Sequence, residues 1–220
     1  MKNLLSIIRS SIVIVGLGVI ISGTSTAAFT ETTSNIGNTF ITGTAGFQLL
    51  NDRSYGTYDP VTNKFFITDA ECAITCTTSI PGTDFGTLFP GWHSSILMKS
   101  VNTGTLNLKV FSDATITGGN PLLADWLQVR VYGWDDLDSD GVLDPGENTG
   151  EYGSGPYTIR EWIIQDPYSD LGQIGKVNGE NEVRGFIYKF SVKYGIPGSL
   201  QGSSISFDFS LNGTTEGAIQ

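Results

Sequence analysis

Acidic residues recur at fixed spacing between residues 136 and 147, where the sequence reads DLDSDGVLDPGE. Calcium-binding loops of this length carry oxygen ligands at loop positions 1, 3, 5, 7, 9 and 12, and a glycine at position 6 allows a sharp turn. Gly141 is the sixth residue of this segment. The pattern predicts that a calcium ion is held by Asp136, Asp138, Asp140, the main-chain carbonyl of Val142, Asp144 and Glu147.

The chemistry of calcium fits this segment. Ca2+ takes about 6–8 oxygen ligands, and carboxylates this close together repel one another when no cation is present. We therefore expect a Ca2+ site at residues 136–147, and a solvated acidic loop is the alternative. The flanking segments 127–134 and 148–155 are typical of a strand and a glycine-rich chain rather than of two sensor helices. The site is therefore expected to stiffen a β-protein, where weak binding suffices at extracellular calcium levels.

Catalytic patterns are missing from the sequence. It contains one histidine, His93, which excludes a paired-histidine metalloprotease motif, and no nucleophile elbow surrounds it. Neighbouring carboxylates such as Asp135 and Asp136 are expected by chance in so acidic a chain, so a glycosidase pair is weakly supported. We expect a protein that is not an enzyme.

Two cysteines, Cys72 and Cys76, are the only thiols in the chain. An exported protein meets an oxidising compartment, which favours a local disulfide between them. Free thiols are an alternative. A zinc site is a weaker one, because two cysteines and His93 do not supply four ligands.

Composition and periodicity indicate many short strands. Only 15% of the 220 residues are charged, and 28 are glycine, which suits strands joined by turns. Apolar and polar residues alternate with the period of a half-buried strand in four segments: 106–110, 127–132, 183–194 and 205–211. Residues 96–101 and 39–50 are expected to be further strands. We predict an all-β, jelly-roll-like antiparallel β-sandwich.

The sequence divides into three parts. Residues 1–27 are typical of a signal peptide, with an apolar run too short to span a membrane and small residues that predict cleavage between Ala27 and Ala28. A retained membrane anchor is the alternative. Residues 28–40 are expected to form an extended segment. Residues 41–220 are expected to form the sandwich, with long loop insertions at 51–90 and 145–180.

The start, centre and end of the chain carry short motifs in a characteristic order. They are Ala28-Phe29 with Asn38-Thr39-Phe40 and Gly43-Thr44, the segment FPGWHSSILMKSVNTGTLNL at 89–108, and LQGSSISFDFSL at 200–211. This order resembles the TasA/camelysin family, whose members are exported with a SipW-type signal peptidase. Regions 51–88 and 150–182 have no counterpart in the resemblance.

The resemblance implies a secreted fibre subunit of the biofilm matrix or cell surface. After signal-peptide cleavage, residues 28–40 of one copy would lie as a donated strand in the next copy, which is a form of β-augmentation. Head-to-tail addition gives an open filament rather than a ring. The expected partners are copies of the chain itself, other matrix subunits and, during export, the signal peptidase. The net charge of −10 argues against nucleic acid.

Two other functions are compatible with the residues. A monomeric calcium-dependent adhesion or carbohydrate-binding module would need exposed aromatic residues near the loop, and Trp126, Trp134 and Tyr152 are the candidates. Some camelysin-like proteins are described as metalloproteases, and the ligands for a zinc site are missing here.

Overall fold

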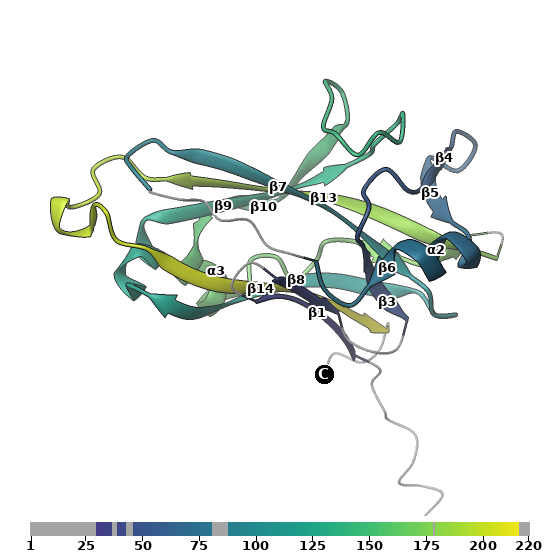
Figure 1. Ribbon diagram of the computed structural model, residues 1–220, viewed down its shortest axis with the longest axis horizontal. Coiled ribbons are helices and arrows are strands. Elements are labelled where there is room, and N and C mark those ends of the chain that lie inside the picture. The colour runs from purple at the N-terminus through teal and green to yellow at the C-terminus, as the bar shows by residue number, and fades with distance from the viewer. Residues whose placement is uncertain (1–29, 37–38, 43–45, 81–87, 178, 216–220) are drawn as a thin grey trace, which may run out of the picture.

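Two antiparallel sheets lie face to face and form a β-sandwich (Figure 1). The computed structural model describes residues 30–36, 39–42, 46–80, 88–177 and 179–215. The predicted signal peptide, residues 1–27, and its cleavage site at Ala27 and Ala28 lie outside the described residues. The prediction of an all-β antiparallel sandwich is confirmed, and its jelly-roll connectivity stays a prediction.

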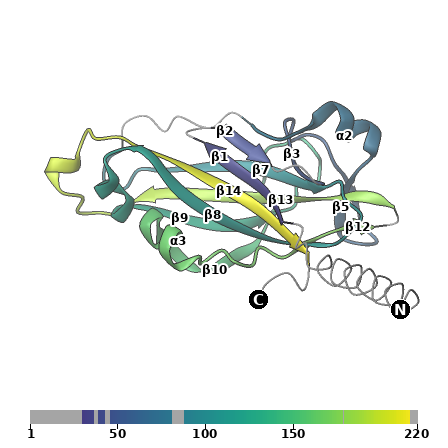
Figure 2. The same cartoon turned by 90° about the horizontal axis from the view of Figure 1, so that it is seen from below.

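The first sheet has five strands, most of which are labelled side by side in Figure 2. In spatial order they are β11 (Gln173–Ile174), β8 (Leu108–Gly119), β14 (Ile205–Thr215), β1 (Thr30–Ile36) and β2 (Thr39–Thr42). The segment expected to be extended, residues 28–40, therefore supplies β1 and part of β2, which form a hairpin at one edge. Residues 28–29 and 37–38 lie outside the described residues.

The second sheet is larger and has nine strands. Its main path is β10 (Asn148–Thr158), β9 (Leu127–Trp134), β13 (Glu180–Val192), β7 (His93–Asn102), β3 (Phe47–Leu50) and β6 (Cys76–Thr77). Off this path lie β4 (Thr57–Asp59), β5 (Lys64–Ile67) and β12 (Lys176–Val177). Strand β13 is central, since it pairs with both β9 and β7 along most of its length.

Aromatic side chains fill the space between the two sheets. Tyr188 of β13 and Phe209 of β14 come from opposite sheets, and their ring centroids are 4.6 Å apart. Helix α3 (Ile159–Gln165) adds Trp162, whose ring stacks on Tyr188 and whose indole N–H donates to the carbonyl of Ser112. From sequence alone, residues 159–164 (IREWII) are compatible with either a strand or a short helical turn. A capping box between Thr158 and Glu161 begins the helix.

A second, smaller core covers the outer face of the nine-stranded sheet. It consists of Leu50, Phe65, Ile67, Cys72, Val101 and Val183. Helix α2 (Asp69–Thr75) belongs to this layer, and Cys72 and Cys76 form a disulfide at its end. The insertion at 51–90, expected to be mostly loop, therefore contains three short strands and a helix in its described part. This layer covers β7, and residues 98–102 are all buried although their side chains alternate between the two faces of the sheet.

Short 3₁₀ helices complete the described secondary structure, η1 at Pro121–Asp125 and η2 at Gly198–Leu200. Among the residues that the structure describes, no helix is long and apolar enough to cross a membrane.

The aromatic core predicts a large difference between two truncations. Phe209 is 1% exposed and Leu106 is 55% exposed. Phe209→Ala is expected to lower the free energy of unfolding by about 3–5 kcal/mol, because it leaves a cavity between the sheets. Leu106→Ala, the control, should change it by less than about 0.5 kcal/mol. Urea denaturation followed by tryptophan fluorescence measures both, and equal losses would contradict this core.

Candidate metal centre

The predicted calcium loop connects β9 to β10 and projects from the nine-stranded sheet, at the top of Figure 1. The two strands pair at Trp134 and Asn148. The amide of Asp135 also donates to the carbonyl of Glu147 at 2.9 Å. The loop is therefore closed at its base by backbone hydrogen bonds, and its first and last acidic residues start from neighbouring positions.

Main-chain amides of the loop turn toward its first and last carboxylates. Asp136 accepts hydrogen bonds from the amides of Asp140 at 3.1 Å and Gly141 at 2.9 Å. Glu147 accepts from the amides of Leu137 at 2.8 Å and Asp144 at 2.9 Å. Gly141 has φ +77°, a conformation that other residues rarely adopt. The turn predicted at the sixth loop position is therefore present.

The structure brings the predicted acidic ligands together. One oxygen from each of Asp136, Asp138 and Glu147 lies within 4.8 Å of the other two, and the same holds for Asp138, Asp140 and Asp144. Asp138 belongs to both groups and joins them. Asp136 and Glu147 are buried, whereas the other three are exposed. This cluster can hold a metal ion, and its carboxylate oxygens suit hard cations.

Val142 has a different place in the loop. Its side chain is 55% exposed, and its amide donates to a carboxylate oxygen of Asp140 at 2.7 Å. The role of its carbonyl as a ligand stays a prediction.

The carboxylates of the loop disfavour one another's charged form. Desolvation raises the pKa of Asp138, and the neighbouring charges of Asp140, Glu147 and Asp136 raise it further. Desolvation also raises the pKa of Asp135, the residue before the loop, against the opposing charge of Arg184. A cation among these groups would favour their charged forms and so lower the pKa of Asp138 and of Asp135.

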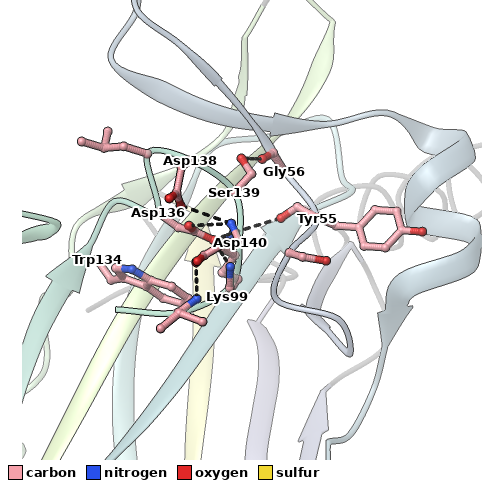
Figure 3. Close-up of polar contacts among 12 residues, drawn as sticks. Tyr55, Gly56, Lys99, Trp134, Asp136, Asp138, Ser139 and Asp140 are labelled. Carbon is pink, nitrogen blue, oxygen red and sulfur yellow. Dashed lines mark hydrogen bonds and ion pairs between the residues drawn. The ribbon is translucent and has the colours of Figure 1, made fainter. Parts of the chain in front are cut away.

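Lys99 of β7 is a charged residue of this site that the sequence pattern of the loop does not predict. Its side chain is 2% exposed, and its ammonium donates to Asp136 at 2.7 Å and to the carbonyl of Tyr55 at 3.0 Å (Figure 3). Burial lowers the pKa of Lys99, and the hydrogen bond and charge of Asp136 oppose that shift. The available signal was a lysine inside the apolar strand segment 96–101, where a charged side chain needs a partner.

Trp134 forms an aromatic wall beside this pair. Its ring centroid is 5.3 Å from the ammonium of Lys99, and its indole N–H donates to Glu147 at 3.2 Å. Gly185 of β13 lies between the two residues, in register with Lys99 on one side and with Trp134 on the other. A Cβ at Gly185 would collide with the carbonyl oxygen of Trp134. The glycine therefore permits the close approach of Trp134 to β13, on whose other side Lys99 lies.

Residues 53–56, the part of the insertion that precedes β4, pack against the loop. Ser139 donates its hydroxyl to the carbonyl of Gly56 at 2.7 Å. A Cβ at Gly141 would meet the amide of Ser54 at 3.0 Å, so the two backbones lie close together. Three segments far apart in sequence thus meet at this site: the loop, the insertion at 53–56 and strand β7.

Other candidate groups do not join this site. His93 is exposed, with its Nδ1 3.5 Å from the carbonyl of Gly91. Both cysteines are in the disulfide, so neither is a thiolate ligand. Within the described part of the chain, the two carboxylate groups of the loop are the only sets of three or more His, Cys, Asp or Glu side chains close enough to share an ion.

A carbohydrate-binding module would need exposed aromatic residues near the loop, and two of the three candidates do not meet this requirement. Trp134 is 1% exposed and lies beneath the loop. Trp126 lies before the first residue of β9, whereas the loop follows its last residue, roughly 30 Å away at the rise of an extended strand. Tyr152 is half-buried, with its ring 6.1 Å from that of Phe186.

Comparisons of the chain with protein-family models, with curated proteins and with solved structures found no match.

A methyl group at Gly185 is expected to damage the site. Gly185→Ala must push Trp134 away, which should lower the free energy of unfolding by about 1–3 kcal/mol and change the near-ultraviolet circular dichroism of tryptophan. Gly198→Ala is the matched control, because nothing lies within 4 Å of a Cβ there. Urea denaturation compares the two variants, and an unchanged Gly185→Ala protein would show that this close approach is unimportant.

Proposed function

We propose that the chain is an exported structural protein of the cell surface or extracellular matrix. In this proposal it assembles with its own copies, and with other matrix subunits, by donating its N-terminal strand, and calcium stiffens it. The proposal assigns no catalytic role. The observation that carries it is the position of β1 on the edge of β14.

Strand β1 covers an edge that would otherwise be open. Residues Thr30–Ser34 pair antiparallel with Thr214–Ser210 of β14, while the other side of β14 pairs with β8. Removing β1 would leave the backbone groups of β14 without partners, which is unfavourable and invites another strand. The same segment from a second copy can restore the same hydrogen bonds, so exchange between copies conserves backbone pairing.

The position of β1 also suits head-to-tail growth. A subunit that has donated its own strand needs one from another subunit, and this requirement repeats along the assembly. Such a contact joins two different surfaces and gives an open filament. Strand β2 is the edge strand of the sheet, and β1 is its only strand partner among the described residues. The β1–β2 hairpin is therefore attached to the sheet through the hydrogen bonds between β1 and β14, and only these must break when it leaves.

Calcium is the ion that we propose for the loop. The six predicted ligands are all oxygens, and calcium accepts about 6–8 of them with flexible geometry. Magnesium requires near-ideal octahedral geometry and keeps several waters, so it is rarely enclosed by a protein loop of this kind. Five carboxylates also supply enough negative charge for binding at the calcium levels outside cells.

The alternative of a monomeric carbohydrate-binding module has less support. It depends on aromatic rings that face solvent beside the loop, whereas Trp134 is buried there and holds Glu147. A protease role would need zinc ligands in addition to His93, which belongs to no group of three or more candidate ligands among the described residues.

Calcium binding should depend on the exposed loop carboxylates. The double variant Asp138→Asn/Asp140→Asn is expected to weaken calcium binding at least about 100-fold, since even outer-shell partners of a metal contribute about 10–100-fold. Isothermal titration calorimetry measures the affinity. Asp125→Asn is the control, because that carboxylate pairs with Arg160 at the opposite end of β9. Wild-type protein that takes up no calcium would contradict the proposed ion.

Filament formation should require the N-terminal segment. Mature protein beginning at residue 28 is expected to form filaments in negative-stain electron microscopy. A version that lacks residues 28–38 is expected to form none, because no strand is available to cover β14 of a neighbour.

A peptide provides the control for this truncation. A synthetic peptide of residues 28–38 should shorten wild-type filaments by occupying the edge of β14, whereas a scrambled peptide of the same composition should not. Normal filaments from the truncated protein would show that strand donation is wrong.

A further inference from the structure

The ammonium group of Lys99 lies inside the site that is proposed to bind calcium. Its ammonium is 2.7 Å from Asp136, and the two side chains are 2% and 0% exposed. The carbonyl of Tyr55 and the rings of Trp134 and Phe65 surround the ammonium, at 3.0, 5.3 and 5.8 Å. A lysine enclosed in this way is a built partner of Asp136 rather than a surface side chain near it.

The remaining loop carboxylates have no such partner. In the described part of the chain, no ion pair joins a lysine or arginine to Asp138, Asp140, Asp144 or Glu147. Lys99 therefore neutralises one of the five acidic residues, the most deeply buried one. The other four still present negative charge to a cation.

Burial makes the charge of Asp136 the critical one. A buried carboxylate without a partner strongly destabilises a fold, whereas exposed carboxylates are solvated by water. Without a metal ion, Lys99 is the charged partner of Asp136. With a metal ion among the loop oxygens, Asp136 has two positive neighbours.

We propose that Lys99 is an internal counter-ion that keeps the loop folded when no calcium is bound. This inference rests on the proposed calcium site and concerns its regulation. Calcium then stiffens a loop that already has its shape, instead of folding it. The carbonyl of Tyr55 extends this support to the insertion at 53–56, because the same ammonium holds both segments.

The test compares thermal unfolding of the mature protein with and without calcium. Without calcium, Lys99→Met is expected to lower the melting temperature by about 10 °C, because Asp136 loses its charged partner and keeps only the hydrogen bonds from the amides of Asp140 and Gly141. With saturating calcium the loss is expected to be less than about half of that, because the metal ion replaces the missing charge. The calcium-induced rise in melting temperature is therefore larger in Lys99→Met than in the wild type.

Two further variants separate charge from packing. Lys64→Met removes a lysine that pairs with another buried carboxylate, Glu182 at 2.9 Å, and its calcium-induced rise should equal that of the wild type. Lys99→Met/Asp136→Asn removes both charges, so its melting temperature without calcium should lie above that of Lys99→Met. If Lys99→Met folds only with calcium, the expected result of this comparison is that the double variant folds without calcium.

Each outcome has a separate meaning. An equal or smaller calcium-induced rise in Lys99→Met, or a double variant no more stable than the single one, would overturn the counter-ion. Calorimetry of the wild-type protein tests the calcium site itself. If the wild type binds calcium and the rise is not larger, only the role of Lys99 fails. If neither protein binds calcium, the proposed ion fails.

Discussion

The ion pair between Lys99 and Asp136 is the interaction on which the loop end of the molecule depends. Neither charge is acceptable alone where it lies, because both side chains are almost completely buried. The pair uses a lysine of β7 on the outer face of the sheet, with the ring of Trp134 on one side, and Gly185 permits the close approach of Trp134 to β13. Residues 53–56 of the insertion also contact the pair, because the ammonium of Lys99 donates to the carbonyl of Tyr55. The insertion is therefore part of the site, although it supplies none of the predicted metal ligands.

The two sheets have separate tasks in this account. The nine-stranded sheet holds the loop and its counter-ion, and it is covered on its outer face by α2 and the β4–β5 hairpin. The five-stranded sheet has β14 beside β1, where exchange between copies is proposed. The aromatic core of Trp162, Tyr188 and Phe209 joins the sheets. The proposed calcium site and the proposed exchange edge therefore lie on different sheets of the sandwich.

The sequence predicted the features that depend on local spacing. Strands such as β9 and β14 showed their period of two, and the loop ligands lie within one short segment, so no tertiary information was needed. Helices α2 and α3 were missed or left open, although the capping boxes Thr68–Glu71 and Thr158–Glu161 mark their starts. The local sequence marks Lys99 only as a lysine within an apolar strand, without naming its partner, and it gives no sign of the role of Gly185. Their roles come from the register of β7, β13 and β9, which joins residues distant in sequence. The burial of Trp134 has the same non-local origin.

A high-resolution reconstruction by cryo-electron microscopy of the mature protein, assembled in calcium, tests the central claim most directly. The account predicts filaments in which residues 30–34 of one subunit run antiparallel to β14 of the next, with density for an ion enclosed by the loop carboxylates. Separate molecules at high concentration, or filaments in which β1 stays on its own β14 and the contacts lie elsewhere, would contradict it.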